Sequence, residues 1–122
     1  LIAVTALTSF SEERFAAIYH APIESTAIAM ARMAHEQALD GVVCSVHESR
    51  KIKQATARDF MTVTPGVRPF GESSDDQQRV ANLASAHQQE CDLIVVGRPI
   101  YQADDPASVV RRILEQMSGP VE

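Results

Sequence analysis

The residues best suited to chemistry in this sequence are a glycine and an arginine that directly follow an apolar run. Gly97 and Arg98 come after residues 93–96, which are four consecutive apolar residues. Glycine lets a ligand approach the backbone closely, and the planar donor fork of arginine matches phosphate oxygens. The pair therefore predicts an anion site at the end of a buried strand. Taken alone, it fits an ordinary buried strand with a surface arginine equally well.

Other polar side chains occupy equivalent places after the remaining apolar runs. Thr8 follows the first run, Ser45 follows the second, and Arg68 lies in a proline-rich loop after the third. Gln77 lies in the longest polar stretch, residues 69–78, and loops of this kind are either mobile and functional or simply disordered. The hydroxyl of Thr8 suits a hydrogen bond to a ligand, although capping a helix is an alternative role for such hydroxyls.

Strands and helices must bring these residues together. The apolar runs predict four strands, at residues 1–7, 42–44, 60–63 and 92–96. Apolar spacing and capping residues predict a short helix through residue 17, a longer one over 23–38, short ones over 46–55 and 83–89, and one from residue 106 onward. Suitable caps for these helices are Ser9 with Glu12, Ser45 with Glu48, Asn82, and Asp105 followed by Pro106.

The faces of three helices can be interpreted from their composition. Small residues on one side of 23–38 suit close packing against a sheet, whereas Arg50, Lys51 and Lys53 are expected to face solvent. The last helix carries an apolar stripe formed by Val109, Val110, Ile113, Leu114 and Met117.

Strands that alternate with helices in this way predict an α/β fold with a parallel sheet. Two architectures fit, a doubly wound open sheet and part of a (β/α)8 barrel. Barrels build their active sites at the carboxyl ends of the strands and often hold phosphate there. Arg68, Gln77 and Arg98 would converge at that end, which is a stronger phosphate signal than either arginine alone. The sequence has no Walker loop or GxGxxG turn, which weakens the nucleotide-fold alternative.

Composition limits the possible functions. The 122 residues amount to one domain, and a net charge of −5 without a Lys/Arg cluster argues against nucleic-acid binding. No apolar run approaches the roughly 20 residues of a membrane span, so we expect a cytoplasmic protein. Cys44 and Cys91 have no metal-ligand spacing and are interpreted as reduced, buried thiols. The chain begins with Leu inside a strand pattern, from which we expect a piece of a longer protein.

Several segments together resemble orotidine 5′-phosphate decarboxylase. They are residues 1–9, 39–45, 63–69 with its Thr-Pro-Gly-Val-Arg-Pro, Asp76-Gln77, and 95–100 with its Gly-Arg-Pro-Ile. The resemblance covers essentially the whole chain and implies that residues 1–122 form the C-terminal half of a (β/α)8 barrel, strands five to eight, with the N-terminal half absent. It also implies decarboxylation of orotidine 5′-monophosphate to UMP without metal or organic cofactor, and a homodimer in the intact enzyme.

The same resemblance assigns roles in binding to particular residues. Thr8 corresponds to a hydroxyl beside the pyrimidine, Arg68 and Arg98 to substrate and phosphate ligands, and Gly97 to a backbone donor. Gln77 corresponds to a loop amide that reaches from the phosphate toward the base. The catalytic Lys and Asp residues of the family belong to its first strands and have no counterpart here. We therefore assign no catalytic residue, and we expect the isolated chain to be inactive.

Three other readings remain open at this stage. The chain could belong to another phosphate-binding barrel lyase, such as a sugar-phosphate decarboxylase or synthase. It could be a non-catalytic half-barrel that binds phosphate ligands, or a purely structural half-barrel. The paired carboxylates at 75–76 and 104–105, and the four histidines, lack the neighbours that acid–base or metal chemistry needs, and they receive no role.

Overall fold

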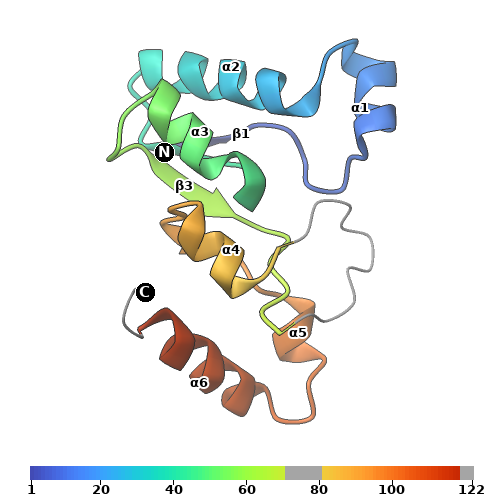
Figure 1. The fold of residues 1–122 in the computed structure, drawn as a ribbon, viewed down its shortest axis with the longest axis vertical. Helices are drawn as coiled ribbons and strands as arrows, with labels where there is room; N and C mark the ends of the chain where they lie inside the picture. Colours follow the sequence, from blue (N-terminus) through green and yellow to red (C-terminus); the bar gives the residue numbers. More distant parts are fainter. Residues whose placement is uncertain (71–80, 119–122) are drawn as a thin grey trace.

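The four expected strands form one parallel sheet. The structure is a computed structural model that describes residues 1–70 and 81–118 (Figure 1). Its strands lie in the order β1-β2-β3-β4, and every neighbouring pair is parallel. The strands are β1 (Ile2–Val4), β2 (Gly41–Val43), β3 (Met61–Thr64) and β4 (Leu93–Ile94). This arrangement confirms the predicted α/β class with a parallel sheet.

The first and last strands are shorter than their apolar runs. Residues 1–7 and 92–96 were expected to be extended throughout, whereas only Ile2–Val4 and Leu93–Ile94 are strand. A strand needs a hydrogen-bonded partner at each position, which an apolar run alone does not supply. The last run is also less buried than predicted, because Leu93 and Val95 are 52% and 49% exposed. Single bonds continue the pairing beyond both strands, because Thr5 N donates to Val43 O and Val95 N donates to Thr64 O.

The register of the sheet aligns an apolar row across all four strands. Val4 pairs with Val43, Val43 with Val63, and Val63 with Leu93. Every member of this row is at least partly exposed. The adjacent position in β2, Val42, is fully buried in a cluster with residues of α2 and α3. Since successive side chains point to opposite faces, the row lies on the face that these helices do not cover.

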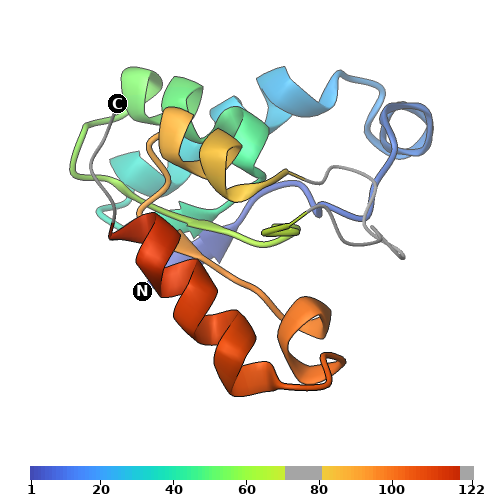
Figure 2. The same ribbon diagram turned by 60° about the horizontal axis from the view of Figure 1, so that its bottom comes forward.

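Six helices accompany the strands in the part of the chain that the structure describes. They are α1 (Glu12–Tyr19), α2 (Ile23–Glu36), α3 (Val46–Ala55), α4 (Leu83–Gln88), α5 (Arg98–Tyr101) and α6 (Pro106–Met117). Figure 2 shows α2, α3 and α4 gathered on one side of the strands, and Figure 1 shows α5 and α6 at the opposite end of the molecule from α2. Helix α6 contacts α4 and α5. Within the described residues, no helix is long and apolar enough to cross a membrane.

Most of the predicted caps are confirmed. Ser45 and Glu48 form the capping box of α3, Asn82 accepts from Ser85 N, and Asp105 accepts from Ser108 N. The prediction for α1 is wrong, because Ser11 and not Ser9 is its N-cap and accepts from Arg14 N. Both serines precede acidic residues in a plausible helix start, and spacing alone favoured the incorrect one.

Burial confirms one predicted helix face and only part of another. The small residues Ala27, Ala31 and Ala34 of α2 are buried, as expected for close packing on the sheet. In α6, Ile113 is buried and Val109 packs partly against the same cluster. The other members of the predicted stripe, Val110, Leu114 and Met117, are 36%, 56% and 49% exposed. Helical periodicity thus identified an apolar face, part of which the described residues leave uncovered.

Candidate functional site

Three of the predicted site residues follow their strands at the same distance. Thr8, Arg68 and Arg98 each lie four residues after the last residue of β1, β3 and β4, respectively. Because every strand of the sheet runs in the same direction, these residues all belong to the carboxyl edge of the sheet. Thr8 and Arg68 are each only 6% exposed, and Arg98 is partly exposed. The topology therefore gathers a buried hydroxyl and two guanidinium groups at the edge where such folds bind ligands.

Arg68 is held by main-chain bonds on either side of it. Its N–H donates to Ala81 O at 2.8 Å, and Ala81 N donates to Gly66 O at 3.1 Å, which forms a parallel bridge between Val67 and Ala81. Gly66 has a φ of 78°, a conformation that glycine adopts without strain. A guanidinium that is buried to this degree needs acceptors around it, and Nη1 donates to Val67 O at 3.3 Å.

Arg98 begins a helix that the sequence analysis did not predict. Helix α5 comprises one turn, with Gly97 as its N-cap and Pro99 in its first turn. Ile100 N and Tyr101 N both donate to Gly97 O. The signal for this turn was Pro99, because proline is favoured at the start of a helix. The expected loop at Gly97 and Arg98 is thus a helix start, and Gly97 itself is exposed.

Two further predicted residues have different outcomes. Ser45 is fully buried and caps α3, and its own N–H donates to Glu48 Oε2 at 3.0 Å. Its placement supports the capping role. Gln77 lies outside the described residues, as do the paired carboxylates at 75–76.

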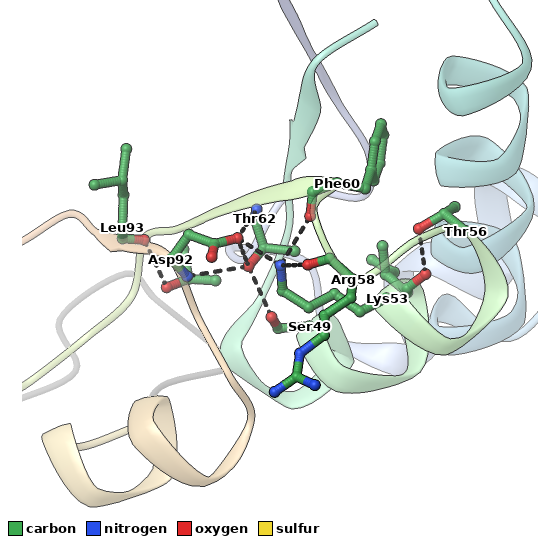
Figure 3. Close-up of polar contacts among 10 residues, drawn as sticks. Ser49, Lys53, Thr56, Arg58, Phe60, Thr62, Asp92 and Leu93 are labelled. Atoms are coloured by element: carbon green, nitrogen blue, oxygen red, sulfur yellow. Dashed lines mark hydrogen bonds and ion pairs between the residues drawn. The ribbon is translucent and has the colours of Figure 1, made fainter. Parts of the chain in front are cut away.

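A second polar cluster, which the sequence analysis missed, lies at the amino ends of β3 and β4 (Figure 3). Its centre is an ion pair between Lys53 of α3 and Asp92, with Nζ and Oδ2 2.6 Å apart. The expectation that Lys53 faces solvent is wrong, since its side chain is only 6% exposed. The ammonium also donates to Arg58 O at 3.1 Å and Phe60 O at 2.9 Å. Basic composition could not reveal this position, because the acceptors come from other parts of the chain.

Asp92 is ionised more readily than an ordinary aspartate. Partial burial raises its pKa, but the hydrogen bonds from Lys53 and Thr62 outweigh that effect, and the net pKa lies below the usual value. Thr62 N donates to Oδ2 at 2.8 Å, and the Thr62 hydroxyl contacts the hydroxyl of Ser49 at 2.8 Å. Thr62 and Ser49 are fully buried, so the cluster satisfies polar groups that would otherwise be costly.

The two cysteines are free thiols, and the candidate site contains no described cluster of metal ligands. Cys44 is buried and Cys91 is partly buried, and burial raises the pKa of the Cys91 thiol. Among residues 1–70 and 81–118, no group of three or more His, Cys, Asp or Glu side chains is placed to hold a metal ion.

Comparison with known proteins gives consistent matches over nearly the whole chain. The sequence model of the orotidine 5′-phosphate decarboxylase / HUMPS family matches residues 1–113. The orotidine 5′-phosphate decarboxylase of Sulfurimonas denitrificans is 59% identical over 117 residues, which are 96% of this chain and 52% of that protein. The enzyme of the same name from Campylobacter jejuni strain RM1221 is 54% identical over 96% of this chain and 42% of its own length.

Solved structures agree. The crystal structure of orotidine 5′-phosphate decarboxylase from Lactobacillus acidophilus has a TM-score of 0.78 and 34% identity, over 98% of this chain and 49% of that one. The structure of the enzyme from Pyrococcus horikoshii OT3, at 20% identity, shows the same fold with a TM-score of 0.69 over 51% of its length. The chain therefore has the fold of half a (β/α)8 barrel and spans about half the length of the curated relatives it matches. With a family match over residues 1–113, the chain belongs to the orotidine 5′-phosphate decarboxylase / HUMPS family.

Proposed function

We propose that residues 1–122 are the C-terminal half-barrel of an orotidine 5′-phosphate decarboxylase and supply its phosphate-binding and pyrimidine-binding side. The observation that carries the proposal is the common placement of Thr8, Arg68 and Arg98 at the carboxyl edge of a parallel sheet. The relatives that share 59% and 54% identity bear this enzyme's name. In the reaction, the carboxylate of orotidine 5′-monophosphate leaves as carbon dioxide, and a proton replaces it on the pyrimidine ring of UMP.

In this proposal, the two arginines bind the anionic part of the nucleotide. Arg98 contacts the phosphate, Arg68 contacts the substrate beside it, and Gly97 offers its backbone N–H. Thr8 bonds the pyrimidine, and Gln77 reaches from phosphate to base. Each charge-assisted hydrogen bond of this kind contributes about 1.5–3 kcal/mol. Binding energy at the phosphate, far from the reacting carbon, then helps to organise the closed catalytic state.

The catalytic groups are proposed to come from a complementary half-barrel. Support for such a partner comes from the apolar row Val4, Val43, Val63 and Leu93, which in a closed barrel would face the packed interior. Val4 and Leu93 are 58% and 52% exposed here. Strands β1 and β4 each have one neighbour in the described sheet, so each offers an edge for pairing. We also propose that the intact enzyme is a cytoplasmic homodimer.

The test reconstitutes the barrel from two pieces. The 122-residue chain is purified and mixed with the N-terminal half of the Sulfurimonas denitrificans relative, and we call the product the reconstituted barrel. UMP binding is measured by calorimetry and turnover of orotidine 5′-monophosphate by the release of carbon dioxide. We expect the reconstituted barrel to bind UMP. We expect turnover in the reconstituted barrel and none with the 122-residue chain alone.

Other outcomes favour the alternatives. UMP binding without turnover in the reconstituted barrel would indicate a non-catalytic binding module. Turnover of a sugar phosphate in place of the nucleotide would indicate another barrel lyase. A folded reconstituted barrel that binds neither UMP nor inorganic phosphate would refute the proposed function and leave a structural role.

A further inference from the structure

We propose that Asp92, anchored by Lys53, is a positioning residue that acts on the anion site from the opposite end of the sheet. The inference rests on the proposed function, because it concerns how Arg98 and Arg68 are held relative to each other. Asp92 does not touch the proposed ligand site: it precedes β4, whereas Arg98 follows it.

Main-chain pairing between β3 and β4 is short. Only Val63 with Leu93 and Thr64 with Ile94 are paired in register. In the same register the next pair is Thr62 with Asp92. At this pair, hydrogen bonds that involve side chains replace the main-chain hydrogen bonds between the strands. Thr62 N donates to Asp92 Oδ2 at 2.8 Å, and Asp92 N donates to the Thr62 hydroxyl at 3.3 Å. These two bonds connect a third residue pair between β3 and β4, in addition to the two pairs in the sheet.

Lys53 of helix α3 bonds directly to this third residue pair. Its ammonium has three donors, and they bond Asp92 Oδ2, Arg58 O and Phe60 O. Arg58 and Phe60 lie in the connection that leads into β3. One buried cation therefore connects the start of β3 with the start of β4, as Figure 3 shows. Loss of the Asp92 carboxylate would leave a nearly buried charge without its counter-ion.

The contacts of Asp92 can affect the arginines at the carboxyl edge because both arginines follow their strands at a fixed distance. Arg68 lies four residues after β3, and Arg98 lies four residues after β4. A slip of one residue between these strands would displace Arg98 by about 3.3 Å and turn the β4 side chains to the other face. The donor–acceptor distance of a hydrogen bond to phosphate can vary by only a few tenths of an ångström. The register of β4 against β3 therefore determines whether Arg98 and Arg68 can bind the same anion.

The experiment measures UMP affinity in the reconstituted barrel with Asp92→Asn and Asp92→Ala. Asn keeps an acceptor for Thr62 N but loses the ion pair, and Ala loses both. The matched control is Asp104→Asn, which removes the same charge from an exposed position in the turn before α6. We expect the dissociation constant to rise about 3- to 30-fold in the Asp92 variants and to stay unchanged in the control.

A double-mutant cycle separates positioning from general stability. Each variant is measured at a temperature where circular dichroism shows it fully folded, so that affinity reports only the folded protein. If Asp92 acts by positioning Arg98, Asp92→Asn raises the dissociation constant for UMP by a smaller factor when Arg98→Lys is also present. If Asp92→Ala fails to fold, Asp92→Asn decides the question.

The results distinguish the inference from the function it rests on. An Asp92→Asn protein that unfolds more easily but binds UMP as tightly as the parent overturns the positioning role alone. Effects of Asp92→Asn and Arg98→Lys that simply add also overturn it. Absence of UMP binding in the unsubstituted barrel refutes the proposed function and this inference with it.

Discussion

The guanidinium of Arg112 lies over the ring of Phe70, with Cζ 3.9 Å from the ring centroid. Arg112 belongs to α6 and Phe70 follows the loop that carries Arg68, so this contact joins the last helix to the candidate site. Phe70 also packs against the cluster that contains Val67 and Ile113. The arginine-bearing loop is therefore held from the helix side as well as by its bridge to Ala81.

The cation–π contact should contribute measurably to stability. Arg112→Met keeps most of the side-chain volume but removes the charge, and we expect it to lower the free energy of unfolding by about 0.5–1 kcal/mol. Urea denaturation of the reconstituted barrel gives this value. Arg111→Met, at the exposed neighbouring position, is the control and should change stability by less than about 0.5 kcal/mol. Equal effects of the two substitutions would contradict a specific contact.

Gly41 should not tolerate a side chain. A Cβ at this position would overlap the carbonyl oxygen of Met61 and lie 2.7 Å from its Cβ, because β2 and β3 approach closely there. We expect Gly41→Ala to destabilise the protein by about 1–3 kcal/mol in thermal or urea unfolding. Gly97→Ala is a useful comparison, since its Cβ would meet Tyr101 at an ordinary 3.7 Å. A neutral Gly41→Ala would show that the two strands can separate without cost.

The stability of the protein should depend on the ionisation of Asp92. Its pKa in the folded protein is lowered, since hydrogen bonds from Lys53 and Thr62 outweigh the opposing effect of burial. The unfolded state then binds the proton more readily, so stability rises with pH in this range. The contribution is complete above the unfolded pKa of about 3.9 and disappears as the pH falls through the lower folded value. Unfolding measured from about pH 5 to pH 2 should show a flatter profile for Asp92→Asn than for the parent.

Arg98 should be specific for the anionic part of the ligand. We expect Arg98→Ala to weaken UMP binding by about 10- to 100-fold and to leave the much weaker binding of uridine nearly unchanged, because only the phosphate would lose its charge-assisted bonds. Calorimetry with both ligands makes the comparison. Arg111→Ala removes the same charge from exposed α6 and should leave both affinities unaltered. An equal loss for uridine and UMP would show that Arg98 does not select phosphate.

The chain on its own should associate with itself. Leu1, Leu7, Val95 and Leu114 are each about half exposed or more, in addition to the uncovered row of the sheet. Apolar surface of this extent, next to the two outer strands of the described sheet, favours association. Sedimentation velocity across a concentration series should therefore show oligomers. After the N-terminal half is added, it should show a single species, the reconstituted barrel. A monomer that unfolds in a single transition, with or without that half, would contradict the expectation.

Features that depend on local sequence could be predicted, and features that depend on distant contacts could not. The caps at Ser45, Asn82 and Asp105 were predictable because a cap bonds residues two or three positions away. The failure at Ser9 has the same origin, because Glu12 gives Ser9 the capping-box spacing, whereas Ser11 has Arg14 at that position and nevertheless caps the helix. The burial of Lys53 needed Asp92, 39 residues away, and no local pattern contains that pairing.

The candidate site was predictable to the extent that topology determines it. Alternating strands and helices imply parallel pairing, and parallel pairing puts the residues after each strand at one edge. Thr8, Arg68 and Arg98 were expected there, and the structure places them there. Their roles in binding stay a prediction, as does the whole assignment of Gln77. The one-turn helix at Arg98 was missed because four residues are too few to show a period.

The aligned row Val4, Val43, Val63 and Leu93 also determines where this protein can be cut and recombined. Because the tilted strands of a closed barrel are staggered, this row can continue into a partner half only if the strands of that half meet it with the matching stagger. Exchanging segments between relatives should therefore succeed when the junctions fall in the loops, which leave the level of every strand unchanged. A junction that adds or removes one residue inside a strand would interchange its buried and uncovered faces, whatever the similarity of the parents.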